Sequence, residues 1–394
     1  MSTKTSSDMT SRERVLAAAR GQPVDRVPVM YWLNPHAACR LMAEFQPGRN
    51  RLASWIGRYL WRRFIEGGEL QAGQWPRALP LFLTDYANSA YVLDLGADAA
   101  WKAPADAKGL GQIRRNLYRE NGQLRLRDPW FGSIRGLGGI YADVVEPVIK
   151  SVSDLRAYRL NDLSDTGALR QFRQAHPDAC LLAEVAGVQQ ALSDIMWRTD
   201  QFMLALYDHP AEIAAFQQRL AAWIIGLIRN AVRAGADVIF IGDDYGYTGR
   251  PLISMKMWRE FTYPQLKRLI DAVHEAGALA MLHSCGFQMC FLEHYVEAGL
   301  DVLQSFQPLA GNDFEAAYAR YGDRLTFATG IDVQQGEWMS PEELRADILR
   351  HYRIGRSRNR FILSMTHMLQ YTMPPANVRA LFDMVREIQA GVHD

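Results

Sequence analysis

The sequence predicts an α/β protein built on a (β/α)8 TIM barrel. Short apolar runs rich in β-branched and aromatic residues recur along the 394 residues, and most precede a long stretch with helical periodicity. Such units, repeated over roughly 250 residues or more, match the size of this barrel. No G-x-G-x-x-G motif follows any of the runs, which argues against an open, doubly wound sheet.

The predicted strands are apolar runs that end in a polar or turn-forming residue. They occupy residues 27–32, 79–84, 180–186, 238–242, 279–283, 302–306, 325–329 and 361–365. Amphipathic helices are clearest in the second half of the chain. Residues 210–234 place Trp223, Ile224 and Leu227 on one side, and residues 254–276 begin at a serine and end before Gly277.

Two early stretches, residues 35–75 and 101–147, depart from this rhythm, and we interpret them as insertions over the barrel mouth. The first contains a basic and aromatic helix that could hold a carboxylated ligand or an acidic partner protein, although a solvated helix face is the favoured interpretation. Residues 1–11 are polar and lack the apolar region of a signal peptide. We therefore expect a disordered leader and one catalytic domain over residues 12–394.

Composition excludes several classes of protein. The chain has 44 Lys and Arg against 43 Asp and Glu, a formal net charge of +1, so it has no general attraction to nucleic acid or anionic membranes. Four cysteines are too few for a disulfide framework, and no apolar run reaches the roughly 20 residues of a membrane helix. We expect a cytoplasmic protein without a nucleic-acid or membrane partner.

Polar residues follow the predicted strands, at the end of the barrel where TIM barrels carry their chemistry. A single such residue is more often a loop cap or a structural group. Several that converge on one barrel mouth favour a functional site. The candidates are Asp85, Glu184, Asp243, Asp244, Tyr245, His283, Cys285, Asp332 and His367.

The most informative pair is His283 and Cys285, because residues two apart at a strand end can face the same point and zinc favours imidazole and thiolate ligands. A third ligand is required, and His367 is the best candidate, with Cys290 the weaker one. Three protein ligands leave a fourth position for water or substrate, which is typical of catalytic zinc. The alternative is a small buried cysteine beside a structural histidine.

The chain resembles the uroporphyrinogen decarboxylase superfamily over nearly its whole length. The matching segments are residues 12–28 (RERVLAAARGQPVDRVP), 240–286 (beginning FIGDDYGYTGRP and ending LHSCG), 321–332 (YGDRLTFATGID) and 361–378 (FILSMTHMLQYTMPPANV). The resemblance implies a TIM barrel, in agreement with the pattern of strands and helices.

Within the superfamily, the corrinoid-dependent methyltransferases carry a His-x-Cys-Gly motif after the fifth strand and a later cysteine before a Pro-Pro pair, and these three ligands bind zinc. His283, Cys285 and Gly286 match the motif. His367, seven residues before Pro374, stands in place of the last cysteine. The resemblance therefore implies a Zn²⁺ site of His283, Cys285 and His367 with one ligand altered.

The porphyrinogen decarboxylases of the superfamily supply the alternative interpretation. They carry a histidine where this chain has His367 and an aspartate that Asp85 resembles, and they lack the His-x-Cys-Gly motif. Their arginine pair after the first strand is absent here, where the chain reads Leu33-Asn34-Pro35-His36. The alternative is thus a lyase that acts on a tetrapyrrole without metal. A third interpretation is a barrel that binds a corrinoid or porphyrin without turnover.

The leading hypothesis is a zinc-dependent methyltransferase, the demethylase component of a system. It would move a methyl group between a small methoxylated, aromatic substrate or a thiol and a corrinoid (cobalamin) on a separate partner protein, because no corrinoid-binding domain is visible in the chain. Asp243, Asp244 and Tyr245 would orient the substrate or the metal ligands, and Glu184 would donate a proton or support a ligand. The oligomeric state stays open, with a homodimer one possibility.

Overall fold

Eight parallel strands form one sheet that closes on itself. The structure, a computed structural model, describes residues 9–66, 87–103, 117–121, 123–128, 130–136 and 143–394. The strand order is β1, β14, β13, β12, β11, β8, β7 and β2, which is chain order around a ring. The backbone N–H of Asp98, beside β2, donates to the carbonyl of Val29 in β1 at 2.8 Å, so the two edge strands also lie together. The predicted TIM barrel is therefore confirmed.

The barrel strands are short and all run in the same direction, so their carboxyl ends meet at one end of the barrel, the mouth. The pairing of residues shows that neighbouring strands end at the same height: His283 lies beside Gly242 on one neighbouring strand and beside Gln304 on the other. The strands are β1 (Val29–Met30), β2 (Ala99–Lys102), β7 (Cys180–Ala186), β8 (Val238–Gly242), β11 (Leu279–Ser284), β12 (Val302–Ser305), β13 (Thr326–Ile331) and β14 (Phe361–Met365).

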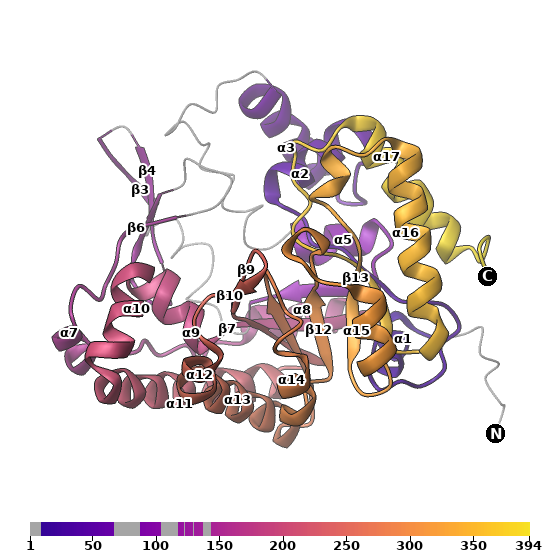
Figure 1. Cartoon of the computed structure of the whole chain (residues 1–394). Coiled ribbons are helices and arrows are strands. Elements are labelled where there is room, and N and C mark those ends of the chain that lie inside the picture. Colours follow the sequence, from indigo (N-terminus) through magenta and orange to yellow (C-terminus); the bar gives the residue numbers. More distant parts are fainter. Residues whose placement is uncertain (1–8, 67–86, 104–116, 122, 129, 137–142) are drawn as a thin grey trace.

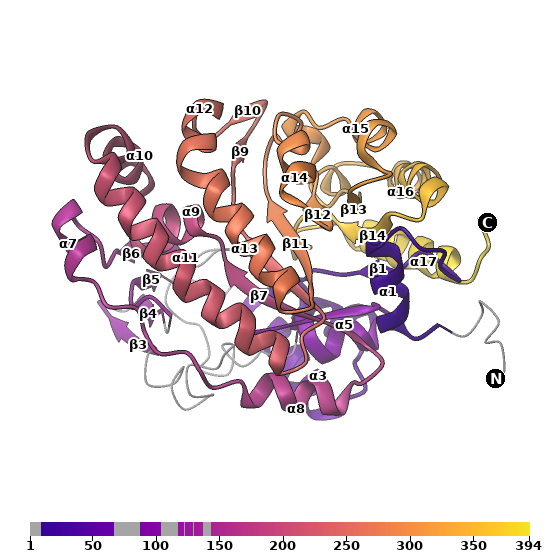
Figure 2. The ribbon, with the colours of Figure 1, turned by 90° about the horizontal axis from the view of Figure 1, so that it is seen from below.

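Helices cover the outside of the barrel. These helices follow one another around it (Figure 2): α11 (Pro210–Arg233), α13 (Tyr263–Glu275), α14 (Leu292–Ala298), α15 (Phe314–Tyr321), α16 (Pro341–Gly355) and α17 (Pro375–Gln389). Further helical segments are α5 (Tyr91–Asp94), α7 (Val152–Ala157), α8 (Gly167–Ala175), α9 (Val188–Gln190), η5 (Ala191–Met196), α10 (Thr199–Asp208), α12 (Met255–Met257), η6 (Trp258–Thr262), η7 (Pro308–Ala310), η8 (Gln335–Glu337) and η9 (Arg356–Arg358). Within the described ranges, no helix combines the length and apolar character that crossing a bilayer requires.

The first helix, α1 (Ser11–Ala19), closes the end of the barrel opposite the mouth. Thr10 and Glu13 form a capping box that starts this helix, so it begins inside the segment expected as a leader. Its buried Val15 and Ala18 join the apolar layer inside the barrel, which the strands supply with residues such as Val238. The bottom of the barrel is therefore packed, and only the mouth is left for chemistry.

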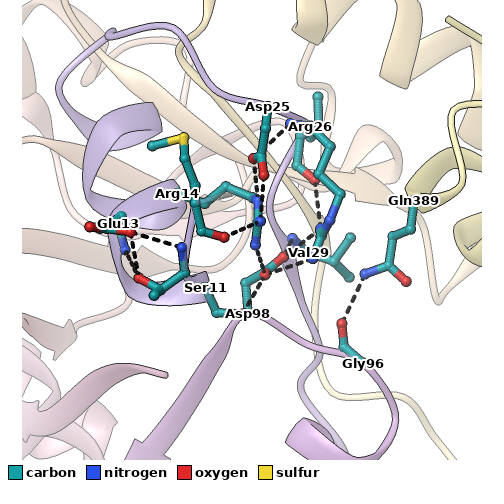
Figure 3. A network of polar contacts seen from close by, with 12 residues as sticks. Ser11, Glu13, Arg14, Asp25, Arg26, Val29, Gly96, Asp98 and Gln389 are labelled. Carbon is teal, nitrogen blue, oxygen red and sulfur yellow. Dashed lines mark hydrogen bonds and ion pairs between the residues drawn. The ribbon is translucent and has the colours of Figure 1, made fainter. Parts of the chain in front are cut away.

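A buried aspartate, Asp98, holds the seam between β1 and β2 (Figure 3). Its carboxylate accepts hydrogen bonds from Arg14 at 2.7 Å, from both terminal nitrogens of Arg26 at 2.8 and 2.9 Å, and from Ser11 at 2.8 Å. It also accepts from the backbone N–H of Val29 in β1 at 2.9 Å. Because β1 is only two residues long, these side-chain contacts replace ladder bonds that the strand is too short to make.

The same device recurs at two other strand pairs. Asp237, just before β8, accepts from the backbone N–H of Leu181 in β7 at 3.0 Å and from Arg12 at 2.8 Å. Asp301, just before β12, accepts from the backbone N–H of Ala280 in β11 at 2.8 Å. Aspartates at the starts of three strands thus tie each strand to the preceding one.

The second barrel strand lies elsewhere than the sequence predicted. It is β2, at residues 99–102, whereas residues 79–84 lie outside the described part of the chain. The sequence of β2 is Ala-Ala-Trp-Lys, in which only tryptophan favours a strand. Burial of all four residues and pairing with β7 stabilise it instead, and neither feature is visible in a local pattern.

The described parts of the two stretches interpreted as insertions lie at the periphery of the molecule, with α2 (Pro35–Arg40) and α3 (Arg51–Leu60) at the top of Figure 1 and β3 (Leu117–Glu120), β4 (Gln123–Arg127) and β6 (Asp143–Glu146) at its left. After β1 come α2, η2 (Leu41–Phe45), α3 and η3 (Trp61–Glu66). After β2 comes an antiparallel sheet of β3, β4, β5 (Ile134–Gly136) and β6. On α3, Trp55 is 57% exposed and its ring stacks on Tyr59, as a solvated helix face predicts.

Candidate metal site

Three of the predicted side chains, those of His283, Cys285 and His367, meet at the barrel mouth. His283 is the penultimate residue of β11 and Cys285 follows that strand, whereas His367 comes two residues after β14. One potential ligand atom from each lies within 4.8 Å of the other two. Nε2 of His283 is 3.1 Å from Sγ of Cys285. Two separate barrel strands thus supply one cluster of nitrogen and sulfur donors.

The loop that carries Cys285 is held by glycines and by Asp244. Gly286 has a φ of +76°, and a Cβ there would lie 2.4 Å from the carbonyl carbon of Gly246, so a larger residue would push the two loops apart. The Asp244 carboxylate accepts from the backbone N–H of Cys285 at 2.7 Å and lies 3.7 Å from Nε2 of His283. Asp244 therefore contacts both residues that β11 and its following loop supply to the cluster.

The donor set fits a zinc ion. Zn–N bonds of ~2.0 Å and Zn–S bonds of ~2.3 Å place tetrahedral donor atoms about 3.3–3.6 Å apart. The separation of 3.1 Å between His283 and Cys285 is slightly shorter than this, and the 4.8 Å limit of the cluster is longer by about 1 Å. Binding of the ion would therefore draw the donor atoms together.

The ionisation of the donors also bears on metal binding. Burial lowers the pKa of His367 to about 4, so its imidazole is neutral at pH 7 and one of its ring nitrogens is unprotonated. Burial and the nearby charge of Asp244 raise the pKa of the Cys285 thiol well above its usual range. A bound zinc ion reverses that preference, because a coordinating thiol is deprotonated.

Two of the three donor residues, His283 and His367, line a cavity of about 880 Å³, which is large enough for a small organic substrate. His283, His367, Asp244 and Glu184 line it together with the aromatic residues Trp32 and Phe240. A second cavity of about 290 Å³ shares Trp32 and Glu184 with the first and extends towards Trp101 and Trp130. The site therefore combines a polar cluster with flat apolar walls.

Trp32, which follows β1, lies against both histidines. Its ring is perpendicular to that of His283 with centroids 4.8 Å apart, and its centroid is 5.1 Å from that of His367. The rings of Trp101 and Phe240 lie 5.6 and 5.9 Å from it. These contacts restrict how far either histidine can turn.

Glu184 projects from β7 into the cavity, where water reaches its side chain while the barrel wall surrounds it. Burial raises the pKa of its carboxyl. No hydrogen bond or ion pair to it occurs among the described residues. A carboxyl of this kind can donate or accept a proton at a bound substrate.

Asp243 and Tyr245 lie behind the cavity wall, not in it. Asp243 accepts from the backbone N–H groups of Gln189 and Gln190 at 3.3 and 2.7 Å and from the Tyr245 hydroxyl at 2.8 Å. A Cβ at Gly187 would lie 2.2 Å from that of Asp243, so a glycine permits this approach. Both residues are buried and hold α9 against β8, which favours a structural role over contact with substrate.

Other sequence candidates fall outside the cluster. Cys290 is half-buried and does not belong to the donor group that the described residues form. Asp332 accepts hydrogen bonds from the backbone N–H groups of Gln334 and Gln335, at 2.9 and 3.3 Å, and so caps the loop after β13. Asp85 lies outside the described residues.

Several polar cavity residues were not anticipated from the sequence, Gln190 and Asp194 among them. Gln190 donates to the Asp244 carboxylate at 3.2 Å, and Asp194 lies on the same wall. Both come from the α9 and η5 segment, which has no strand pattern and no motif. The polar character of residues just after β7 was the only available signal.

Comparison with known proteins gives one family. A family model described as uroporphyrinogen decarboxylase (URO-D) matches residues 138–388. The uroporphyrinogen decarboxylase of Pseudomonas paraeruginosa is 23% identical over 191 residues, which are 48% of this chain and 52% of that protein. The aligned part thus spans about half the length of that relative. The uroporphyrinogen decarboxylase of Chromohalobacter salexigens is 24% identical over 391 residues and matches 97% of this chain and 98% of its own.

Among solved structures, one described as a methyltransferase from Methanosarcina mazei has a TM-score of 0.58 and 17% sequence identity. The match covers 97% of this chain and 100% of that one. At this level of identity the likeness concerns the fold alone.

Proposed function

Because the chain belongs to the uroporphyrinogen decarboxylase family, we propose that it is a zinc-dependent methyltransferase of that family. It would move a methyl group between a small methoxylated aromatic substrate, or a thiol, and a corrinoid on a separate protein. The observation that carries the proposal is the convergence of His283, Cys285 and His367, of which both histidines line a substrate-sized cavity.

His283, Cys285 and His367 would hold the metal. When bound, zinc supplies Lewis acidity to an oxygen or sulfur atom of the substrate, and the corrinoid supplies a cobalt that accepts or donates the methyl group. Asp244 keeps Cys285 and His283 in place through the contacts described above. The protein's part is to bind, orient and exchange protons with the substrate.

Glu184 is the proton donor in this proposal. Removal of a methyl group from an ether leaves an oxygen that must gain a proton, and Glu184 faces the cavity with a raised pKa. Trp32 and Phe240 would provide the surfaces on which an aromatic ring stacks. These walls support a methoxylated aromatic substrate as a class, and they do not distinguish one such compound from another.

A decarboxylase-like lyase is the second candidate, and the names of the relatives favour it. Two features weigh against it. The chain has Cys285 beside His283, a pair that a metal-free reaction does not need. After β1, Asn34 caps α2 where porphyrinogen decarboxylases carry their arginine pair.

The proposal is tested by following cobalt absorbance when the zinc-loaded protein is mixed with a reduced cobalamin and methoxylated aromatic donors. We expect methylcobalamin to form, and to form far more slowly with Cys285→Ser. Turnover of a porphyrinogen by metal-free protein, without any methyl transfer, would assign the chain to the second candidate.

A further inference from the structure

The ring of His283 is oriented by a residue on the neighbouring strand, Gln304 in β12. Nδ1 of His283 donates to Oε1 of Gln304. The amide nitrogen of Gln304 donates in turn to the carbonyl of Met365 at 2.9 Å. An amide oxygen only accepts and an amide nitrogen only donates, so these two bonds define both the amide orientation and the ring nitrogen that carries the proton.

A proton on Nδ1 leaves the lone pair on Nε2, the nitrogen that lies 3.1 Å from the Cys285 sulfur. Gln304 is fully buried and His283 is 4% exposed, so bulk water cannot replace the bond. Without Gln304, the Nδ1 proton of His283 would be buried without an acceptor. The ring would then gain by moving its proton to Nε2, where it would block the metal.

Gln304 also joins the two strands that supply the ligands. Met365 ends β14 two residues before His367, and β13 lies between β12 and β14 in the sheet. The bond from Gln304 to Met365 therefore reaches across β13 and couples the position of His283 to the strand end that precedes His367.

The backbone just after Gln304 is unusual as well. Ser305 and Phe306 have φ values of +104° and +71°, which side chains other than glycine rarely adopt. Such conformations persist only where the surroundings impose them, and they concentrate at functional sites. The end of β12 is thus held in a defined arrangement next to the donor cluster.

We propose that Gln304 is a positioning residue of the metal site: it selects the Nδ1–H tautomer of His283 and so presents Nε2 to the metal. The inference rests on the metal site of the proposed function and not on methyl transfer. Partners of this kind typically change metal affinity by about 10–100-fold when they are removed.

The test compares Gln304→Met with wild type and with Gln217→Met. Methionine matches the size of glutamine and makes no comparable hydrogen bond. Gln217 is an equally buried glutamine in α11, and its amide has no hydrogen-bond partner among the described residues, so it controls for the substitution itself. Two measurements are made on each protein: the 15N chemical shifts of His283 in metal-free, 15N-histidine-labelled protein, and zinc affinity by competition with a chelator.

We expect wild type and Gln217→Met to show the Nδ1–H tautomer and equal zinc affinity. Gln304→Met should populate the Nε2–H tautomer and bind zinc about 10–100-fold more weakly. An unchanged tautomer in Gln304→Met overturns the proposal, and so does a changed tautomer with unchanged affinity. If wild type binds no zinc, the proposed function fails, while the tautomer measurement still decides the role of Gln304.

Discussion

Replacing Asp98 with asparagine should weaken the barrel seam while keeping the shape of the side chain. The carboxylate is fully buried, and the side chain of its partner Arg14 is only 7% exposed. Asparagine removes the negative charge and turns an amide N–H₂ towards donors on Arg14, Arg26 and the Val29 backbone. Breaking a buried ion pair by removing one partner costs about 3–5 kcal/mol.

This cost converts into a modest shift in melting temperature because the chain is long. At about 2.1 cal/mol/K per residue, the 394 residues give an unfolding entropy of about 0.8 kcal/mol/K, so the shift is about 4–6 °C. The assay is thermal unfolding followed by circular dichroism. Asp271→Asn is the control, because Asp271 pairs with Lys267 on an exposed helix face and should shift the midpoint by less than about 1 °C. An Asp98→Asn midpoint within 1 °C of wild type would refute the role assigned to the seam.

Three further predictions concern the site. Cys285→Ser and His367→Ala should each weaken zinc binding by more than about 100-fold in chelator competition, because removing a metal ligand lowers the affinity more than removing a residue that only contacts a ligand. Cys290→Ser should bind zinc as wild type does. Glu184→Gln should lower the rate of ether demethylation by about 10²–10⁴-fold with zinc content unchanged, and a wild-type rate would exclude it as the proton donor. Burial raises the pKa of Asp243 from 3.8 to about 7, so the folded state holds its proton longer than the unfolded state, and wild type loses stability as the pH rises between these values. Asp243→Asn cannot ionise, so in metal-free protein its melting temperature relative to wild type should rise across that pH window; a constant difference would contradict the raised pKa.

Most of the fold was predictable because barrel strands with two buried faces leave continuous apolar runs in the sequence. Residues 180–186, 238–242 and 361–365 were placed with the bounds that the structure shows. The second strand, residues 99–102, escaped because its identity depends on burial against β7 and on Asp98, which are tertiary features. The strand propensities of single residues do not reveal such contacts.

The site was predictable to the extent that it lies at strand ends. His283, Cys285 and His367 come together because parallel strands bring their carboxyl ends to one level. Asp243 and Asp244 are adjacent, yet only Asp244 faces the cavity. That division depends on how the loop after β8 turns, and the sequence does not specify it.

The central claim is that His283, Cys285 and His367 bind a catalytic zinc. The most direct measurement is zinc X-ray absorption together with metal content, on protein purified without chelator or nickel affinity. The account predicts about one zinc per chain with two imidazole nitrogens and one sulfur at ~2.0 and ~2.3 Å, and loss of the sulfur contribution in Cys285→Ser. Protein without zinc, or zinc without a sulfur ligand, would contradict it.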